Sequence, residues 1–280
     1  MRFDEVVERL ATEEPRSSLA LGALLHTRRP WLETRLLAAG PGDRSWCPVV
    51  RTEPGVWLAY PLLRHRDDAA DLGRAIDRSP ALAVQGASSD VEPLVPYLRR
   101  VIEIRSLQRI TVPTPIDWEP PSAATRMASV LDLAALDDLY DGYEVPFGRT
   151  RRAMARMVRE AVEEARVIVV DGTTGGLDAA MVAVTRTPRW IEWSSLTVRP
   201  AARGKRLSWA LVTRAVAVSN ATGLGFVAIV GPRNPMRLPE GFGVIDTVSE
   251  VDLWLPDRVR GERRLRRLWF RIDKTRRRRP

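Results

Sequence analysis

Apolar residues recur along this chain at two spacings, one typical of helices and one typical of strands. Between residues 149 and 165, Met154, Met157, Val158 and Val162 fall on one stripe at helical spacing, which predicts an amphipathic helix. Helices are predicted at 3–11, 17–27, 69–77, 132–143 and 149–165, and from the turn at 203–206 to about residue 219. Residues 90–101 look helical in part.

Strands are predicted where β-branched and apolar residues form short runs or alternate with polar ones. These runs occupy 46–50, 56–62, 81–86, 102–112, 125–130, 166–170, 177–185, 190–198, 225–230, 243–248 and 250–255. In the second half the order is strand, two helices, three strands, helix, strand, loop and two strands. Many strands with few helices between them predict an α/β fold, more narrowly an α+β fold built on a mixed sheet.

A proline-rich stretch divides the chain near its middle. Residues 110–127 read ITVPTPIDWEPPSAATRM, and the prolines disfavour regular structure around them. We therefore interpret 112–123 as a linker. A length of 280 residues is suited to two domains. The predicted division is a first domain at 1–116, a second at 117–256 and a tail at 257–280.

The positive charge of the protein is confined to that tail. Residues 257–280 contain 12 Lys and Arg against 3 Asp and Glu, which equals the net charge of +9 of the whole chain. The rest of the chain is neutral, which argues against a broad nucleic-acid-binding face on the body. Leu265, Leu268, Trp269 and Ile272 recur at helical spacing. The tail is interpreted as a docked helix with a disordered Arg run, or as a handle for an anionic partner.

Composition limits the class of protein further. Hydrophobic residues make up 45% of the chain, which is ordinary for a globular protein. The single cysteine, Cys47, excludes an internal disulfide and favours a reducing compartment. No apolar run has the length of a membrane span, and the acidic N-terminus does not resemble a signal peptide, so a cytoplasmic protein is expected. His26 and His65 have no second ligand at metal spacing, so no metal is expected.

The stretch VRPAARGKRLSWALV, residues 198–212, combines a strand end, a basic turn and a helix start. The first backbone N–H groups of a helix have no partner within the helix, and the helix dipole favours an anion there. The donors of residues 204–207 would point at such an anion, and Lys205 and Arg206 add positive charge. The pattern predicts a phosphate site, although many strand–turn–helix corners look similar.

The element order of the second half and the stretch Val198–Pro200–Arg203–Gly204 resemble the GNAT superfamily of acyl-CoA-dependent acyltransferases. In that family an Arg/Gln-x-x-Gly-x-Gly/Ala turn grips the pyrophosphate of coenzyme A. The resemblance covers about 123–255. The first half looks like the degenerate half of tandem-GNAT proteins, so we expect two GNAT-like halves, of which the second is a complete GNAT fold.

The motif departs from the family pattern at two positions. Arg206 replaces the first motif glycine and Ser208 replaces the second Gly or Ala. Glycine lets the backbone approach a phosphate closely, so Arg206 must swing outward or pair with a phosphate itself. The family's later features are matched by Asn234 and by Gly241-Phe242. The resemblance implies acetyl-CoA or another acyl-CoA as cosubstrate, held by Leu196, Val198, Arg203, Gly204, Lys205, Arg206, Leu207, Ser208 and Asn234.

Acyl transfer to an amine needs a base, and the resemblance implies Glu192 for this role. Its apolar neighbours would raise the pKa of the carboxyl, whereas a solvent-facing strand position is the alternative interpretation. The family's usual tyrosine acid is missing, since no Tyr follows Tyr143. Ser194, Ser195 or solvent could take its place, or the reaction could proceed without a general acid; Ser194 is the candidate catalytic residue. Trp190 and Trp193, which flank Glu192, are interpreted as core residues more readily than as the lining of an acceptor pocket.

Three hypotheses for function follow from the resemblance. The first is an acyltransferase, in the first place an N-acetyltransferase, that moves an acyl group from coenzyme A to the amine of a small molecule or peptide. The second is a transferase or decarboxylase that acts on an acyl group bound to a carrier protein or tRNA, recruited by the basic tail. The third is a catalytically inactive GNAT used as a binding protein.

Overall fold

The strands of the protein form one mixed sheet. The computed structural model describes residues 3–14, 16–25, 34–53, 56–111, 124–141, 151–173, 175–230 and 242–254. The sheet has eleven strands in the order β1-β2-β3-β4-β11-β5-β10-β9-β8-β7-β6. The strands are β1 (Thr34–Ala39), β2 (Ser45–Glu53), β3 (Val56–Ala59), β4 (Ala83–Ala87), β5 (Val101–Thr111), β6 (Thr125–Met127), β7 (Val167–Asp171), β8 (Leu177–Arg186), β9 (Trp190–Val198), β10 (Gly225–Val230) and β11 (Gly243–Leu253). The predicted α/β class with a mixed sheet is confirmed.

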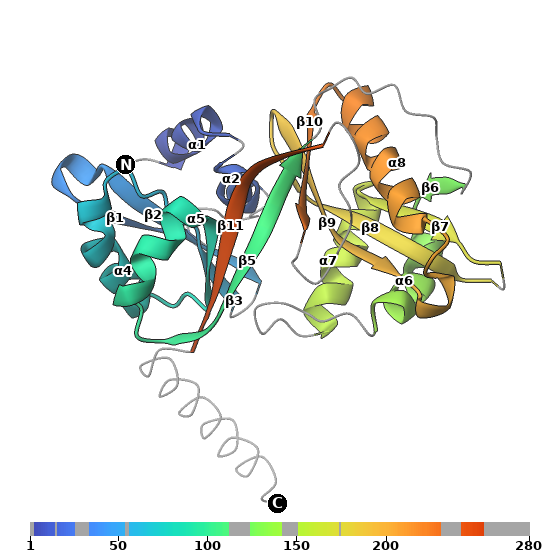
Figure 1. The fold of residues 1–280 in the computed structure, drawn as a ribbon, viewed down its shortest axis with the longest axis horizontal. Helices are drawn as coiled ribbons and strands as arrows, with labels where there is room; N and C mark the ends of the chain where they lie inside the picture. The colour runs from blue at the N-terminus through green and yellow to red at the C-terminus, as the bar shows by residue number, and fades with distance from the viewer. Residues whose placement is uncertain are drawn as a thin grey trace, which may run out of the picture.

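Helices cover both faces of the sheet (Figure 1). The α-helices are α1 (Phe3–Thr12), α2 (Ser18–Leu25), α4 (Ala69–Arg78), α5 (Ser88–Val91), α6 (Leu133–Tyr140), α7 (Arg151–Glu163) and α8 (Leu207–Ala221). Short 3-10 turns are η1 (Pro41–Asp43), η2 (Arg66–Asp68), η3 (Glu92–Tyr97), η4 (Val130–Asp132) and η5 (Pro200–Ala202). Successive residues of a strand point to opposite faces of the sheet. In β9, Trp193 packs against α8 on one face, and the preceding residue, Glu192, points toward α2 on the other.

The same parallel unit occurs once in each half of the chain. In the first half β3 leads through α4 to β4, and in the second half β9 leads through α8 to β10; each pair of strands is parallel. The final strands of the two halves then interleave. β11 pairs with β4 and β5, whereas β5 pairs with β11 and β10. Figure 1 shows β5 and β11 side by side at the centre of the molecule. The halves therefore share one continuous sheet, and the predicted boundary at 116/117 stays a prediction.

Two predictions about individual strands were wrong. The runs at 243–248 and 250–255 form the single strand β11, because Ser249 and Glu250 continue the ladder with β4 instead of ending it. The edge strand β1 was not predicted, since its residues are half exposed and show no clean alternation. The linker at 112–123 and the tail at 257–280 lie outside the described residues.

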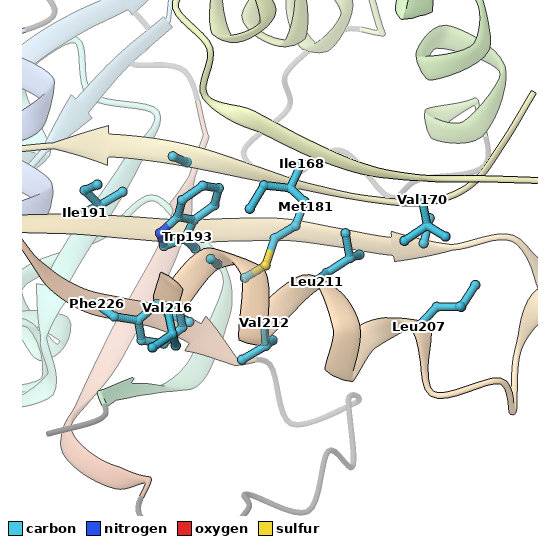
Figure 2. Close-up of a cluster of buried hydrophobic side chains, with 14 of the residues drawn as sticks. Ile168, Val170, Met181, Ile191, Trp193, Leu207, Leu211, Val212, Val216 and Phe226 are labelled. Atoms are coloured by element: carbon cyan, nitrogen blue, oxygen red, sulfur yellow. The ribbon is translucent and has the colours of Figure 1, made fainter. Parts of the chain in front are cut away.

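The core of the second half lies between α8 and the strands β7 to β10. Figure 2 shows Trp193 and Met181 from the sheet facing Leu211, Val212 and Val216 of α8. The indole Nε1 of Trp193 donates to Ser219 Oγ at 3.2 Å, so its polar atom is satisfied. Trp193 is therefore a core residue, as the first of the two interpretations had it. This packing fixes both β9 and the start of α8, which carry the candidate site.

Candidate functional site

The strands β9 and β10 pair at their amino ends and part at their carboxyl ends. Their parallel ladder runs from Trp190 opposite Gly225 to Trp193 opposite Ala228. Beyond it, β9 continues to Val198 along β8, whereas β10 continues to Val230 along β5. In open α/β sheets, ligands bind beyond the carboxyl ends of strands at such a point.

A β-bulge lies in β9 where the two strands have parted. The register with β8 shifts between Ala180 and Val182, and Ser195 has φ +52°. The hydroxyl of Tyr140, on α6, donates to the carbonyl of Ser195 at 2.7 Å and so holds the bulge. Sequence reasoning missed Tyr140. Its place on the buried stripe of α6 was the available signal, because a buried tyrosine hydroxyl needs a partner.

The turn between β9 and α8 has the shape of an anion-binding loop. Gly204 has φ +84°, and Arg206 has φ +57° and ψ +22°. Arg206 therefore adopts the left-handed conformation for which a glycine is normally required. Among the described residues, no acceptor is found for the backbone N–H groups of 204–208, which lie at and before the N-terminus of α8. The side chains of 203–206 are exposed.

Glu192 points away from α8 and lies under α2. Its side chain is 0% exposed, which excludes the solvent-facing interpretation. Ser18 Oγ donates to Glu192 Oε2 at 3.1 Å, whereas Oε1 has no hydrogen-bond partner among the described residues. Burial raises the pKa of this carboxyl to about 7, opposed by nearby Arg109 and by the Ser18 hydrogen bond. The site thus contains a carboxyl that exchanges its proton near neutral pH.

A second buried charge supports this carboxyl. Arg109, on β5, is 0% exposed and donates to Ser18 Oγ at 3.1 Å and to the Arg16 carbonyl at 3.4 Å. Its Nε lies 3.0 Å from Asp246 Oδ1, on β11. Sequence reasoning missed Ser18, Arg109 and Asp246, because they come from three distant segments and no local pattern joins them to Glu192.

Comparisons with known proteins agree with this topology. The chain matches no protein-family model and no curated protein sequence. Solved structures do match. A GCN5-related N-acetyltransferase from Sphaerobacter thermophilus superposes with a TM-score of 0.59 at 15% identity, covering 89% of each chain. A tandem GNAT protein from the clavulanic acid biosynthesis pathway gives a TM-score of 0.53 at 14% identity over 90% of this chain and 96% of that chain.

An acetyltransferase of the GNAT family from Colwellia psychrerythraea gives a TM-score of 0.53 at 11% identity, covering 79% of this chain and 86% of that chain. The chain has the GNAT fold. At these identities the likeness is one of fold, and it extends over both halves. Any activity has to be argued from the residues at the site.

The two GNAT-like halves differ in their chemistry at equivalent positions. In the β9–β10 ladder, Glu192 occupies the second-to-last paired position of β9. Leu58 occupies the corresponding position of β3 in the β3–β4 ladder. Helix α8 has no acidic residue in its first turn, whereas α4 has Asp68 at its N-cap and Asp71 in its first turn. A negative charge at α4 would repel an anion. Among the described residues, a buried carboxyl on the strand and a helix start free of acidic residues therefore occur together only in the second half.

The remaining predicted site residues of this GNAT fold lie near the bulge and the turn. Leu196 and Val198 are partly buried against the α8 core, Leu207 belongs to that core, and Ser194 and Ser208 are half-buried. Asn234 lies outside the described residues. Trp190 covers Gly225, where an added Cβ would meet its ring at 2.3 Å.

Two further observations concern the described residues as a whole. No helix among them is long and apolar enough to cross a membrane. In the same part of the chain, no three His, Cys, Asp or Glu side chains form a group that could hold a metal ion. His65 is exposed there and lies 3.6 Å from Asp67.

Proposed function

We propose that the second half binds an acyl-CoA and transfers its acyl group to an amine, with Glu192 as the general base. One observation carries this proposal. Strand β9 has a fully buried carboxyl close to the point where β9 and β10 separate. The same strand leads directly into the turn at 203–206 before α8, which we call the donor turn because its backbone N–H groups at 204–206 have no acceptor among the described residues. General-base chemistry and phosphate binding would thus be fixed relative to each other by a single element.

The donor turn supports the binding of a pyrophosphate. The backbone N–H groups of 204–208 and the positive end of the α8 dipole favour an anion. Arg203, Lys205 and Arg206 are exposed around them, so their charges can reach a phosphate without a desolvation cost to the folded protein. The left-handed backbone at Arg206 keeps the turn in the form that a glycine would give it.

The buried carboxyl supports proton abstraction from an amine. A base works best when its pKa lies near the operating pH, and burial raises that of Glu192 to about 7. The ammonium form of the acceptor would give a proton to Oε1, and the neutral amine would attack the thioester carbonyl. The C–N bond forms, the C–S bond breaks, and the excess proton on the attacking nitrogen passes to the departing coenzyme A thiolate, directly or through solvent or a nearby hydroxyl. Acetyl-CoA is the first donor to test, and a small molecule or peptide amine is the proposed acceptor.

A second candidate function keeps the acyl transfer but changes the donor. The tail carries the whole net charge of +9, which favours recruitment of an anionic carrier protein or tRNA that delivers the acyl group. Salt-sensitive binding of such a carrier, with no binding of acetyl-CoA, would support this candidate against the first.

Calorimetry with acetyl-CoA tests the binding step. Gly204→Glu would place a carboxylate among the donors and is expected to weaken binding about 100-fold or more. Gly223→Glu is the matched control, because Gly223 also has a positive φ and open space around it but lies at the opposite end of α8. Unchanged affinity in Gly204→Glu would contradict the proposed site.

Release of free thiol from a panel of acyl-CoAs, with a panel of amines, tests the chemical step. Glu192→Gln is expected to lower kcat about 100-fold or more while leaving the affinity for acetyl-CoA unchanged. Binding without turnover in the wild-type protein, or equal turnover in Glu192→Gln, would favour a GNAT that binds its ligand without transferring an acyl group.

A further inference from the structure

We propose that Ser18, from the first half of the chain, is a positioning residue that anchors Oε2 of Glu192 and leaves Oε1 as the oxygen that exchanges the proton. The inference rests on the proposed function for its catalytic meaning, but the hydrogen-bond geometry carries it independently. It gives the first half, which has neither the carboxyl nor the donor turn, a direct part in the chemistry of the second.

The direction of each hydrogen bond follows from the chemistry of the three groups. Arg109 Nη1 lies 3.1 Å from Ser18 Oγ, and a guanidinium can only donate. Ser18 Oγ must therefore accept from Arg109. Its single proton is then directed to Glu192 Oε2, also 3.1 Å away. The serine acts as a relay with one fixed orientation.

This orientation determines where Glu192 carries its proton. An oxygen that accepts from Ser18 cannot also point a proton at it, and the unprotonated oxygen of a carboxyl is the better acceptor, so Ser18 favours the protonated form with its hydrogen on Oε1. Oε1 is buried and has no hydrogen-bond partner among the described residues. One oxygen is thus held by the first half, and the other, which has no such partner among the described residues, is left to exchange the proton.

A buried ion pair lies behind the Ser18 anchor. Arg109, which donates to Ser18 Oγ, is fully buried. Asp246 Oδ1 lies 3.0 Å from Arg109 Nε and balances its charge from β11. Behind Asp246, Arg16 forms an ion pair with the buried Asp90.

The charged and hydrogen-bonding groups near Glu192 lie on several different elements. Arg109 on β5 favours the ionised form, and Asp246 on β11 opposes it. The residues paired with Glu192 in the neighbouring strands, Thr185 in β8 and Val227 in β10, carry no charge. Ser18 supplies the hydrogen bond from α2. Removal of that bond alone should disfavour the ionised form.

Ser18→Ala tests the proposal, and Ser17→Ala is the matched control. Ser17 is the neighbouring buried serine, but its hydroxyl donates to the Leu10 carbonyl instead of Glu192. The carboxyl carbon of Glu192 is titrated by ¹³C NMR, with its signal assigned by its loss in Glu192→Gln. Ser18→Ala is expected to raise the titration midpoint by about one to two pH units, since the lost hydrogen bond favours the ionised form of Glu192. Ser17→Ala and Ser18→Thr, which keep the relay hydroxyl, are expected to leave it unchanged.

The same variants are then followed by the pH dependence of kcat/KM. The acid limb should move to higher pH in Ser18→Ala and stay in place in Ser17→Ala. An unchanged NMR midpoint in Ser18→Ala would overturn the inference, whatever the activity. A shifted midpoint in a protein in which Glu192→Gln retains full turnover would keep the inference and overturn the proposed base, so the two failures are distinguishable.

Discussion

The hydroxyl of Ser18 and the carboxyl of Glu192 lie 3.1 Å apart although 174 residues separate them in the chain. One belongs to a helix of the first half and the other to the strand that leads into the donor turn of the second. Through this contact, α2 covers the face of β9 that carries Glu192, and the carboxyl is fully buried. The first half thereby contributes to the burial that raises the pKa of Glu192 to about 7.

Burial of Glu192 should make the stability of the protein depend on pH. Its pKa is raised from 4.5 to about 7 in the folded state, so the folded protein holds this proton more tightly than the unfolded chain. The stabilisation is complete below pH 4.5, falls as the pH rises toward 7 and is lost above it. Glu192→Gln has no such titration, so its stability relative to wild type should increase between pH 4.5 and 8 by about 3 kcal/mol.

Urea unfolding of both proteins at pH 4.5 and pH 8 measures this difference. Glu14, another buried carboxyl with a raised pKa, titrates in both proteins and cancels in the comparison. An advantage of the Gln variant that is equal at the two pH values would show that Glu192 ionises near its ordinary pKa. The expected gain in stability with loss of activity is common for residues retained for function.

Local patterns predicted the frame of the site but not its interior. The strands at 190–198 and 225–230 and the helix after the basic turn were predicted from alternation and turn residues, and all three are present. The face of β9 on which Glu192 lies could not be judged in the same way. Both faces of this strand are covered, one by α8 nearby in sequence and the other by α2, which comes from the far end of the chain.

In β5, too, local sequence does not show which residues are buried. In a strand with one buried face, apolar Ile102 and Ile104 would ordinarily be buried and a charged residue such as Arg109 exposed. In the structure Ile102 and Ile104 are each 50% exposed, whereas Arg109 is completely buried. The reason is tertiary: β5 lies between β10 and β11, and α2 covers the half of its polar face that carries Arg109. Neither partner strand adjoins it in sequence.

The left-handed backbone at Arg206 predicts that a glycine at this position gives a more stable protein than a valine. Arg206→Gly removes the strain of φ +57° and should leave the free energy of unfolding unchanged or raise it by up to about 1 kcal/mol. Arg206→Val loses the same charge but adds a β-branched side chain, and should lower it by about 1–2 kcal/mol. Urea unfolding compares the two variants.

Affinity for acetyl-CoA, measured in the same two variants, then distinguishes the effect of losing the Arg206 charge from the effect of changing the backbone conformation. Both variants lose the exposed guanidinium, which should weaken binding less than about tenfold. Any further loss in Arg206→Val reports distortion of the donor turn. Equal stability and equal affinity in the two variants would show that the turn does not hold residue 206 in the left-handed conformation.

The buried pair of Arg109 and Asp246 should be strongly coupled. Arg109→Met leaves Asp246 half-buried without its partner, and should lower the free energy of unfolding by about 3 kcal/mol. Asp246→Leu in the same background should recover most of that loss, because it removes the carboxylate that Arg109→Met left unpaired. Arg105→Met is the control on the same strand. Arg105 is 24% exposed and pairs with Asp252 at 2.7 Å, so its loss should cost about 1 kcal/mol or less. Additive effects at 109 and 246 in a double-mutant cycle would contradict direct coupling.

The close approach of α2 to the sheet depends on Gly22. A Cβ at this position would lie 2.0 Å from Thr185 Cγ2 and 2.9 Å from Thr185 Oγ1. Gly→Ala inside a helix ordinarily adds about 1 kcal/mol of stability, but here it should lower the free energy of unfolding by about 1–3 kcal/mol. The sign of the effect therefore tests the contact.

Thr185→Ala supplies the matching rescue. It removes Cγ2 and Oγ1, including the atom that the added methyl group would approach most closely, so Gly22→Ala combined with Thr185→Ala should recover at least half of the stability lost in the single variant. Because Ser18 lies one turn from Gly22 on the same helix, Gly22→Ala should also lengthen the Ser18–Glu192 contact and raise the NMR midpoint of Glu192. The double variant should return that midpoint toward the wild-type value. A Gly22→Ala protein that is less stable but titrates like wild type would show that α2 adapts to the added methyl without moving Ser18.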